Sequence, residues 1–170
     1  KARGNIIYSR CFSSLIYSVH VFACTPRICL LSSAVNESTW EHMKLLTTPW
    51  VLWSIAELIA LRRTGLPVLT ARAAGLLAGL AAIPLLFYGY QGVLGRDIMW
   101  LDVAIFQIAV LLGFWVTWAM LRRRALASPV WQVAGAAVLA AVWAAFILWT
   151  FAPPDLPLFA DPETGLRGIR

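Results

Sequence analysis

Residues 130–151 read VWQVAGAAVLAAVWAAFILWTF and contain no charged side chain. An α-helix rises about 1.5 Å per residue, so a helix of this length reaches across the roughly 30 Å hydrocarbon core of a bilayer. Three further apolar runs of membrane-spanning length lie at about residues 39–61, 73–91 and 98–121. The sequence therefore predicts an all-α integral membrane protein, a bundle of four spans.

The composition agrees with a chain that is solvated by the lipid bilayer. Of the 170 residues, 61% are hydrophobic and 13% are charged, whereas soluble domains carry roughly 25% charged residues. This leaves too little polar surface to cover a globule in water, and we expect residues 33–170 to form a single transmembrane helical domain. Residues 1–32 hold all three cysteines and none of the nine tryptophans, and Pro26-Arg27 interrupts their apolar run. They are predicted to form an irregular or interfacial N-terminal segment.

The placement of the positive charges predicts the orientation in the membrane. The net charge of +6 does not indicate nucleic-acid binding, because the arginines gather between apolar runs. The first-to-second and third-to-fourth connections hold Arg62, Arg63 and Arg72, and Arg122, Arg123 and Arg124. On the opposite side only Lys44 and Arg96 lie close to the spans. By the positive-inside rule, we expect the arginine loops in the cytoplasm of a bacterial inner membrane and the Pro-rich C-terminal tail outside.

Polar side chains gather on the predicted outer face. An Asp at mid-span costs about 2.5–3.5 kcal/mol on insertion scales, so such groups usually face a cavity or a partner. Asp102 is either a proton, cation or ligand site, or an interfacial carboxylate that accepts a hydrogen bond from a tyrosine or a loop amide. We expect it to face the bundle interior near Glu41 and His42, or near Asp155. The candidate ligand-binding residues are Asn36, Glu37, Glu41, His42, Tyr88, Asp102 and Asp155.

Catalytic and metal-binding patterns are weak. Glu37 and Glu41 share a helix face, but His42 lies about 100° further round the helix and gives no H-E-x-x-H pattern. A capping box from Ser38 to Glu41 explains Glu41 equally well. The serines and His42 do not form a recognisable set of nucleophile and base. We therefore predict no metal, no cofactor and no catalytic residue.

Three further features have structural interpretations. Glu57 lies near Arg62-Arg63 at the cytoplasmic end of the first span, which predicts either an ion pair or a carboxylate that snorkels to the membrane surface. Gly75 and Gly79 are four residues apart, a spacing that lets two helix backbones approach closely, and they are the predicted contact for a helix–helix partner. Residues 88–92, YGYQG, indicate an exit from the membrane with tyrosines at headgroup depth and glycines in the turn.

The stretch at residues 33–44, SAVNESTWEHMK, is a specific motif. Through this motif the chain resembles a family of small bacterial membrane proteins of unknown function. Three further stretches fit the same pattern: 87–95, 102–106 and 153–162. The resemblance covers residues 33–169 and implies a helical integral membrane protein, usually with one more span before the motif, and no established activity. Residues 1–32 depart from the pattern, which suggests the hypothesis that their codons are read in a shifted frame.

Three functions stay open at this point. The first is a non-enzymatic bundle with an outward-facing polar pocket for a small polar ligand or cation. The second is a membrane-embedded enzyme that uses Glu37, Glu41, His42 and Asp102, which then have to converge around one cavity. The third is a structural partner of another membrane protein, which requires an exposed groove of small residues along the two glycines and Ala82.

Overall fold

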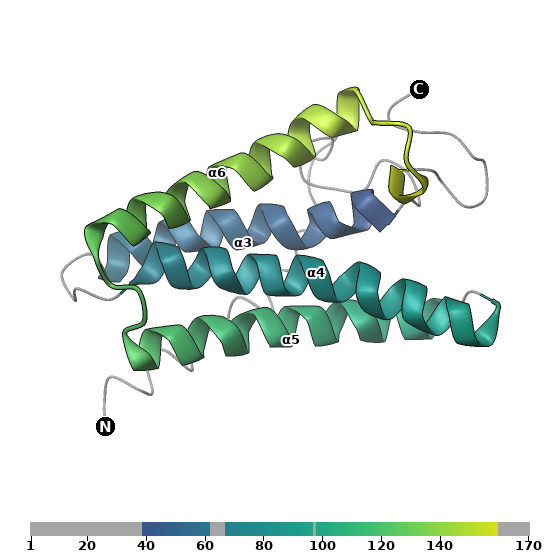
Figure 1. Ribbon diagram of the computed structural model, residues 1–170, viewed down its shortest axis with the longest axis horizontal. Helices are drawn as coiled ribbons and strands as arrows, with labels where there is room; N and C mark the ends of the chain where they lie inside the picture. Colours follow the sequence, from purple (N-terminus) through teal and green to yellow (C-terminus); the bar gives the residue numbers. More distant parts are fainter. Residues whose placement is uncertain (1–38, 62–66, 97, 160–170) are drawn as a thin grey trace. The chain divides into compact units, whose positions relative to one another are not determined.

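The computed structural model describes residues 39–61, 67–96 and 98–159, apart from the side chains of Glu41, His42 and Pro157. The described residues form four α-helices and no strand (Figure 1): α3 (Thr39–Leu61), α4 (Val68–Leu94), α5 (Met99–Arg123) and α6 (Pro129–Phe151), followed by the short 3-10 helix η2 (Pro157–Phe159). The prediction of an all-α, four-span protein is confirmed. The predictions for residues 1–32, for the shifted reading frame and for the capping box fall outside the described residues.

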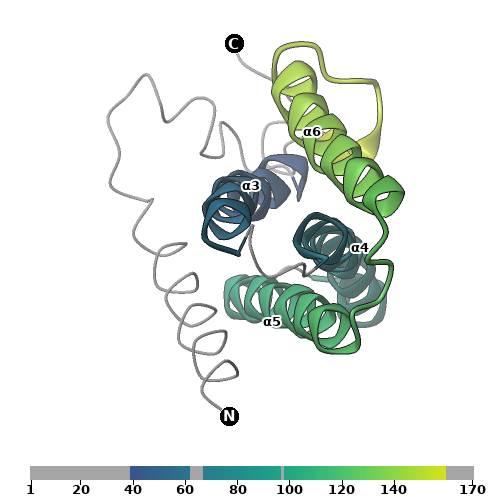
Figure 2. The same cartoon turned by 90° about the vertical axis from the view of Figure 1, so that its left-hand side faces the viewer.

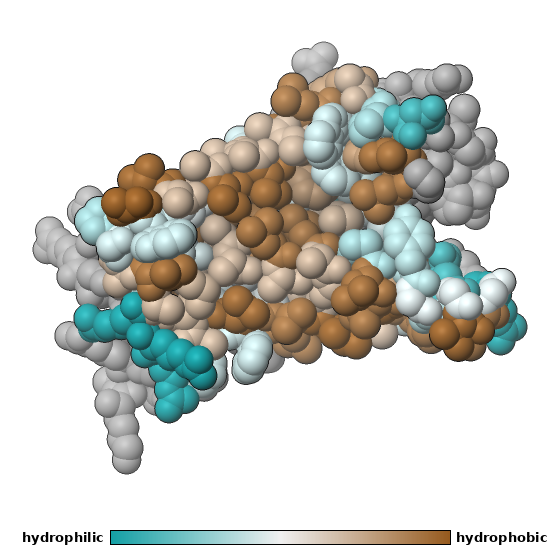
Figure 3. Space-filling model, in the orientation of Figure 1, coloured by the Kyte–Doolittle hydropathy of each residue, from teal (hydrophilic) through white to brown (hydrophobic). Residues whose placement is uncertain are grey.

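All four helices are long and apolar enough to cross a membrane. Large apolar side chains such as Leu85, Trp115 and Val133 are more than half exposed on the outside of the helices. Figure 3 shows the same distribution on α5, which is apolar along its length and hydrophilic at its two ends. An apolar exterior of this kind needs a hydrocarbon solvent. The chain is a multi-pass membrane protein.

Helix α4 is longer at both ends than the predicted span of 73–91. It begins at Val68, so Arg72 lies inside the helix, and the prediction that Arg72 belongs to a cytoplasmic loop is wrong. The helix can include this arginine because a carboxylate on α3 pairs with it, as described below. At the other end Gly89 and Gly92 are helical, and Gly95 ends the helix with a left-handed φ of 63°. Glycine adopts this conformation at little cost because it has no Cβ.

The chain divides into two compact units. The second unit covers residues 54–142 and contains α4, α5, the last part of α3 and the first part of α6. Within it α4 packs along α5, as Figures 1 and 2 show in perpendicular views. Gly75, Gly79 and Ala82 are buried in α4, so the described chain has no exposed groove of small residues along them. A helix–helix partner at this place stays a prediction.

The described part of the first unit consists of residues 39–53 and 143–159. An aromatic cluster holds this unit together. Trp40 of α3 stacks on Phe146 of α6, with 4.1 Å between the ring centroids. Phe159 of η2 and Trp149 of α6 pack against the same indole at 4.6 and 5.1 Å. Aromatic pairs at such distances contribute beyond the area that they bury, so this cluster fixes the position of the Trp40 ring.

Candidate functional site

The buried face of α3 is unusually polar. The exposed residues of α3 include Leu52, Ile55 and Ile59, which are apolar. The buried polar residues of this helix are Lys44, Thr47, Thr48, Ser54 and Glu57. The same helix also buries five apolar residues, namely Trp40, Met43, Leu46, Trp50 and Val51. In a membrane protein, buried ionisable groups mark functional sites by default, and α3 is therefore where a site is to be sought.

Among the described residues of the first unit, Lys44 is a deeply buried cation. Its side chain is 1% exposed, and its Nζ donates a hydrogen bond of 3.2 Å to Oγ1 of Thr150 on α6. The Thr150 hydroxyl in turn donates to the carbonyl oxygen of Phe146 at 2.7 Å. The ammonium group is therefore held at a defined place between α3 and α6. From the sequence, Lys44 was counted only as a charge close to the spans, and its burial was not predicted.

Two buried donors lie one helical turn on either side of Lys44. Trp40 precedes it by four residues and Thr48 follows it by four. The indole Nε1 of Trp40 and the Oγ1 of Thr48 are buried and have no hydrogen-bond partner in the part of the chain that the structure describes. Leaving a buried polar group unpaired costs about 1–3 kcal/mol. Such groups are rare in native structures and each needs an explanation.

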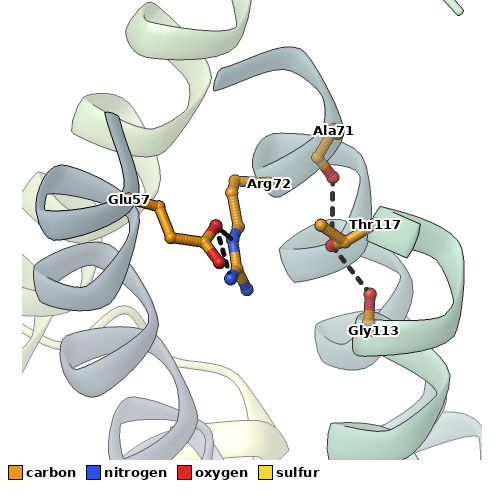
Figure 4. Close-up of polar contacts among 5 residues, drawn as sticks. All are labelled: Glu57, Ala71, Arg72, Gly113 and Thr117. Atoms are coloured by element: carbon orange, nitrogen blue, oxygen red, sulfur yellow. Dashed lines mark hydrogen bonds and ion pairs between the residues drawn. The ribbon is translucent and has the colours of Figure 1, made fainter. Parts of the chain in front are cut away.

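In the second unit, Glu57 and Arg72 form a buried ion pair (Figure 4). The Nε of Arg72 donates a hydrogen bond of 2.7 Å to Oε2 of Glu57, and its NH2 group lies 2.6 Å from the same oxygen. The guanidinium carbon also lies 5.3 Å from the centroid of the Phe114 ring, a cation–π contact. The predicted ion pair of Glu57 is therefore present, but its partner is Arg72 of α4. The described residues do not include Arg62 and Arg63.

Further hydrogen bonds fix the first turns of α4. The hydroxyl of Thr117 on α5 lies 3.2 Å from the Ala71 carbonyl oxygen and 2.9 Å from that of Gly113 (Figure 4). The side chain of Gln132 on α6 accepts a 3.1 Å hydrogen bond from the Leu69 N–H and donates one of 2.7 Å to Thr70. Gln132 thereby satisfies a backbone N–H that the start of a helix leaves without a partner.

Asp102 lies in the first turn of α5 and is bonded to a tyrosine. The hydroxyl of Tyr90, in the last turns of α4, donates a hydrogen bond of 2.5 Å to Asp102 Oδ1. The same hydroxyl accepts a hydrogen bond of 3.4 Å from the Ile98 N–H. The structure therefore contains the tyrosine contact that was one of the two interpretations of Asp102. It joins the end of α4 to the start of α5.

Tyr90 was not among the predicted site residues, whereas Tyr88 was. Tyr88 is 45% exposed, and its ring meets the edge of Phe87. Two positions along a helix are about 200° apart round its axis, so only one of these tyrosines can turn toward α5. Residues 88–92 were interpreted as a turn; a prediction that the helix continues through them would have shown that the two tyrosines face opposite sides.

The remaining candidates are only partly described. Asn36 and Glu37 fall outside the described residues, as do the side chains of Glu41 and His42 in the first turn of α3. Asp155 is exposed, between α6 and η2. Asp102 belongs to the second unit, and Glu41, His42 and Asp155 belong to the first. Their predicted meeting stays a prediction. Among the described residues, no three His, Cys, Asp or Glu side chains come together in a group that could hold a metal ion.

The sequence contained one signal for the residues that were missed. Trp40, Lys44 and Thr48 are spaced by four, which places them on one face of a helix. Arg72 gave no such signal, because its partner Glu57 is on a different helix.

Comparison with known proteins identifies the family of the chain but assigns no activity to it. No curated protein matches the chain, and no solved structure does. One family model matches residues 6–169. The match begins well before residue 33, so it also includes most of the segment that the resemblance set apart. The chain belongs to this family, the family of unknown function DUF6512.

Proposed function

We propose that the protein is a non-enzymatic membrane bundle that binds a small polar ligand or cation in an outward-facing polar pocket. The observation that carries the proposal is Lys44, which is 1% exposed inside a helix able to cross the membrane. A charged group at such a place is costly and is usually retained for a function.

The outward direction of the site follows from the arrangement of the charges. Arg72 and Lys44 are both buried in helices, so neither counts as a loop charge. Five arginines then remain beside the connections from α3 to α4 and from α5 to α6, against Arg96 beside the connection from α4 to α5. The positive-inside rule favours cytoplasmic arginine loops in a bacterial inner membrane. The start of α3 and the end of α6 then face outward, with Lys44 and Thr150 in the outer half of the membrane.

Cysteine labelling in intact cells tests this orientation. In a background without the native cysteines, Thr164→Cys should react with an impermeant thiol reagent, whereas Thr64→Cys and Ser128→Cys should resist it. After the cells are opened, all three should react. Labelling of Thr64→Cys and Ser128→Cys in intact cells, with protection of Thr164→Cys, would overturn the outward direction.

Thermal unfolding of the full chain in a neutral detergent tests the binding. The panel should contain inorganic phosphate, small carboxylates, small amines, monovalent and divalent cations, and a polar small-molecule extract of the cells that make the protein. We expect at least one member to raise the unfolding temperature of the wild-type protein, since a ligand that binds only the folded state stabilises it. The shift should vanish in Lys44→Met. If no member shifts the wild-type protein, or if Lys44→Met keeps the full shift, the proposed function is wrong.

A further inference from the structure

Three consecutive arginines lie at the end of α5. Arg122 and Arg123 belong to the last turn of the helix, and Arg124 is the residue that caps it. All three are exposed, and Figure 3 shows this end of α5 as a hydrophilic patch beside an apolar surface. In the part of the chain that the structure describes, no carboxylate forms an ion pair with any of them. The described residues therefore leave three positive charges uncompensated at one end of a helix.

The residues beside these arginines are apolar and exposed. Leu126, Val130 and Trp131 follow them along the chain, and each exposes a large apolar side chain. The guanidinium carbon of Arg122 lies 5.2 Å from the centroid of the Trp118 ring, one turn earlier in α5, a cation–π contact that holds this arginine against an aromatic surface. All of these residues belong to the second unit. Arginines beside exposed tryptophan and aliphatic side chains, at the end of a helix able to cross the membrane, are expected at the depth of the lipid headgroups.

The backbone at this end of α5 adopts a conformation that its side chains disfavour. Arg124 has a φ of 49° and Leu126 a φ of 56°, in the left-handed region that favours glycine. The Arg124 N–H donates to the Leu121 carbonyl oxygen at 3.3 Å, and the Ala125 N–H donates to that of Met120 at 3.1 Å. These two bonds form a Schellman motif, in which glycine is the usual residue at the position of Arg124. An arginine thus stands where glycine would be less strained, and strained residues of this kind cluster at functional sites.

We propose that Arg122, Arg123 and Arg124 form a binding surface for the phosphate groups of anionic phospholipids. A guanidinium offers five N–H donors in a planar fork that matches the oxygens of a phosphate. Each arginine can bind the phosphate of a different lipid, so the three side chains need not converge and the surface needs no cavity. The exposed apolar side chains beside the arginines favour a lipid over free phosphate, because they can contact its acyl chains. This surface lies in the second unit, and the inference does not depend on the ligand proposed for the first.

Arg96 provides a matched control for Arg123. It is exposed and lies beside the connection from α4 to α5, so the two arginines are at opposite ends of α5. A helix of 25 residues separates them by far more than the screening length of about 10 Å at 0.1 M salt. Replacing either arginine by glutamine removes one exposed positive charge. The pair therefore separates loss of a lipid contact from a change in the net charge of the protein.

The test uses the full chain in a neutral detergent with two labelled lipids. Phosphatidylglycerol and phosphatidylcholine carry the same fluorophore on one acyl chain, and fluorescence anisotropy gives the dissociation constant of each. The wild-type protein should bind phosphatidylglycerol more tightly, because the headgroup of phosphatidylcholine has no net charge. Arg123→Gln should weaken the binding of phosphatidylglycerol about fivefold, the contribution expected for one arginine near a membrane surface. Arg96→Gln should bind phosphatidylglycerol like the wild type, and neither variant should change the binding of phosphatidylcholine.

Arg124→Gly distinguishes a binding role from a structural one. Glycine removes the guanidinium and also relieves the left-handed φ at this position. The unfolding temperature of the variant should therefore rise, while its affinity for phosphatidylglycerol should fall about fivefold. A lower unfolding temperature with an unchanged affinity would show that Arg124 serves the fold alone, and would count against the binding surface.

Three results would overturn the inference. The first is equal affinity of the wild-type protein for the two lipids. The second is an equal loss of phosphatidylglycerol binding in Arg96→Gln and Arg123→Gln, which would mean that only the net charge matters. The third is displacement of the labelled phosphatidylglycerol by inorganic phosphate as readily as by the unlabelled lipid, which would assign the arginines to a free anion instead of a lipid.

Discussion

The two units of the protein differ in the hydrogen-bond partners of their buried polar side chains. In the second unit, the charged pair of Glu57 and Arg72 is joined by a hydrogen bond and an ion pair. The side chains of Gln132, Thr70 and Thr117 there also have partners on neighbouring helices. In the first unit, by contrast, the indole N–H groups of Trp40 and Trp53 and the Thr48 hydroxyl lack partners among the described residues.

This difference separates a structural role from a functional one. A buried polar group with its partners fixes how helices pack, and its removal lowers stability. A buried donor without a partner contributes no such contact and lowers stability while it stays unpaired. Substitutions in the second unit should therefore destabilise the protein. Conservative ones in the first unit should instead affect binding.

The largest effect is expected from breaking the buried ion pair. Glu57→Leu leaves the Arg72 guanidinium buried without its carboxylate, which should cost about 3–5 kcal/mol. Denaturant unfolding of the full chain in detergent micelles measures this loss. The double variant Glu57→Leu with Arg72→Met should recover much of it, because no lone charge stays buried. A single variant as stable as the wild type would mean that this pair does not hold the second unit together.

A smaller effect is expected at the contact between α6 and the start of α4. A Cβ atom added at Gly135 would lie 2.7 Å from backbone atoms of Leu69 and Thr70, and backbone cannot move aside as a flexible side chain can. Gly135→Ala should therefore cost about 1–3 kcal/mol in the same unfolding experiment.

Gly92→Ala is the matched control for Gly135→Ala. Gly92 is helical, and a Cβ at this position would meet nothing within 4 Å. The free energy of unfolding of the Gly92→Ala variant should be unchanged or slightly raised, because alanine is the better helix former. Equal stabilities of the two variants would contradict the close contact at Gly135.

A still smaller effect is expected at the pair of Tyr90 and Asp102. Tyr90→Phe removes the 2.5 Å hydrogen bond to the carboxylate and should cost about 1–2 kcal/mol, since this pair is only partly buried. Tyr88→Phe, which changes a more exposed tyrosine two residues away, should cost less than about 0.5 kcal/mol. If the two variants lose the same stability, Tyr90 does not join α4 to α5.

The sequence predicted the helices well because each is a long apolar run, and such a run can be identified without knowing which helices pack against it. It failed at Arg72, since an arginine beside a span resembles a loop charge until its partner is known. That partner, Glu57, lies 15 positions away on another helix. Lys44 was misjudged for the same reason, because its contact Thr150 is 106 positions away. Asp102 was identified as a polar group within a span, but the choice between Tyr88 and Tyr90 required the true end of α4.

The most direct test of the central claim is the NMR signal of the Trp40 indole N–H in the full chain labelled with ¹⁵N-tryptophan. Trp40→Phe identifies this signal among those of the nine tryptophans. On addition of a member of the thermal panel that binds, the Trp40 proton should move downfield, because its N–H gains an oxygen acceptor. The signal of Trp115, which is exposed on α5, should stay in place. A Trp40 signal that does not move at a saturating concentration of any panel member that binds would contradict the assignment of the binding site to the first unit.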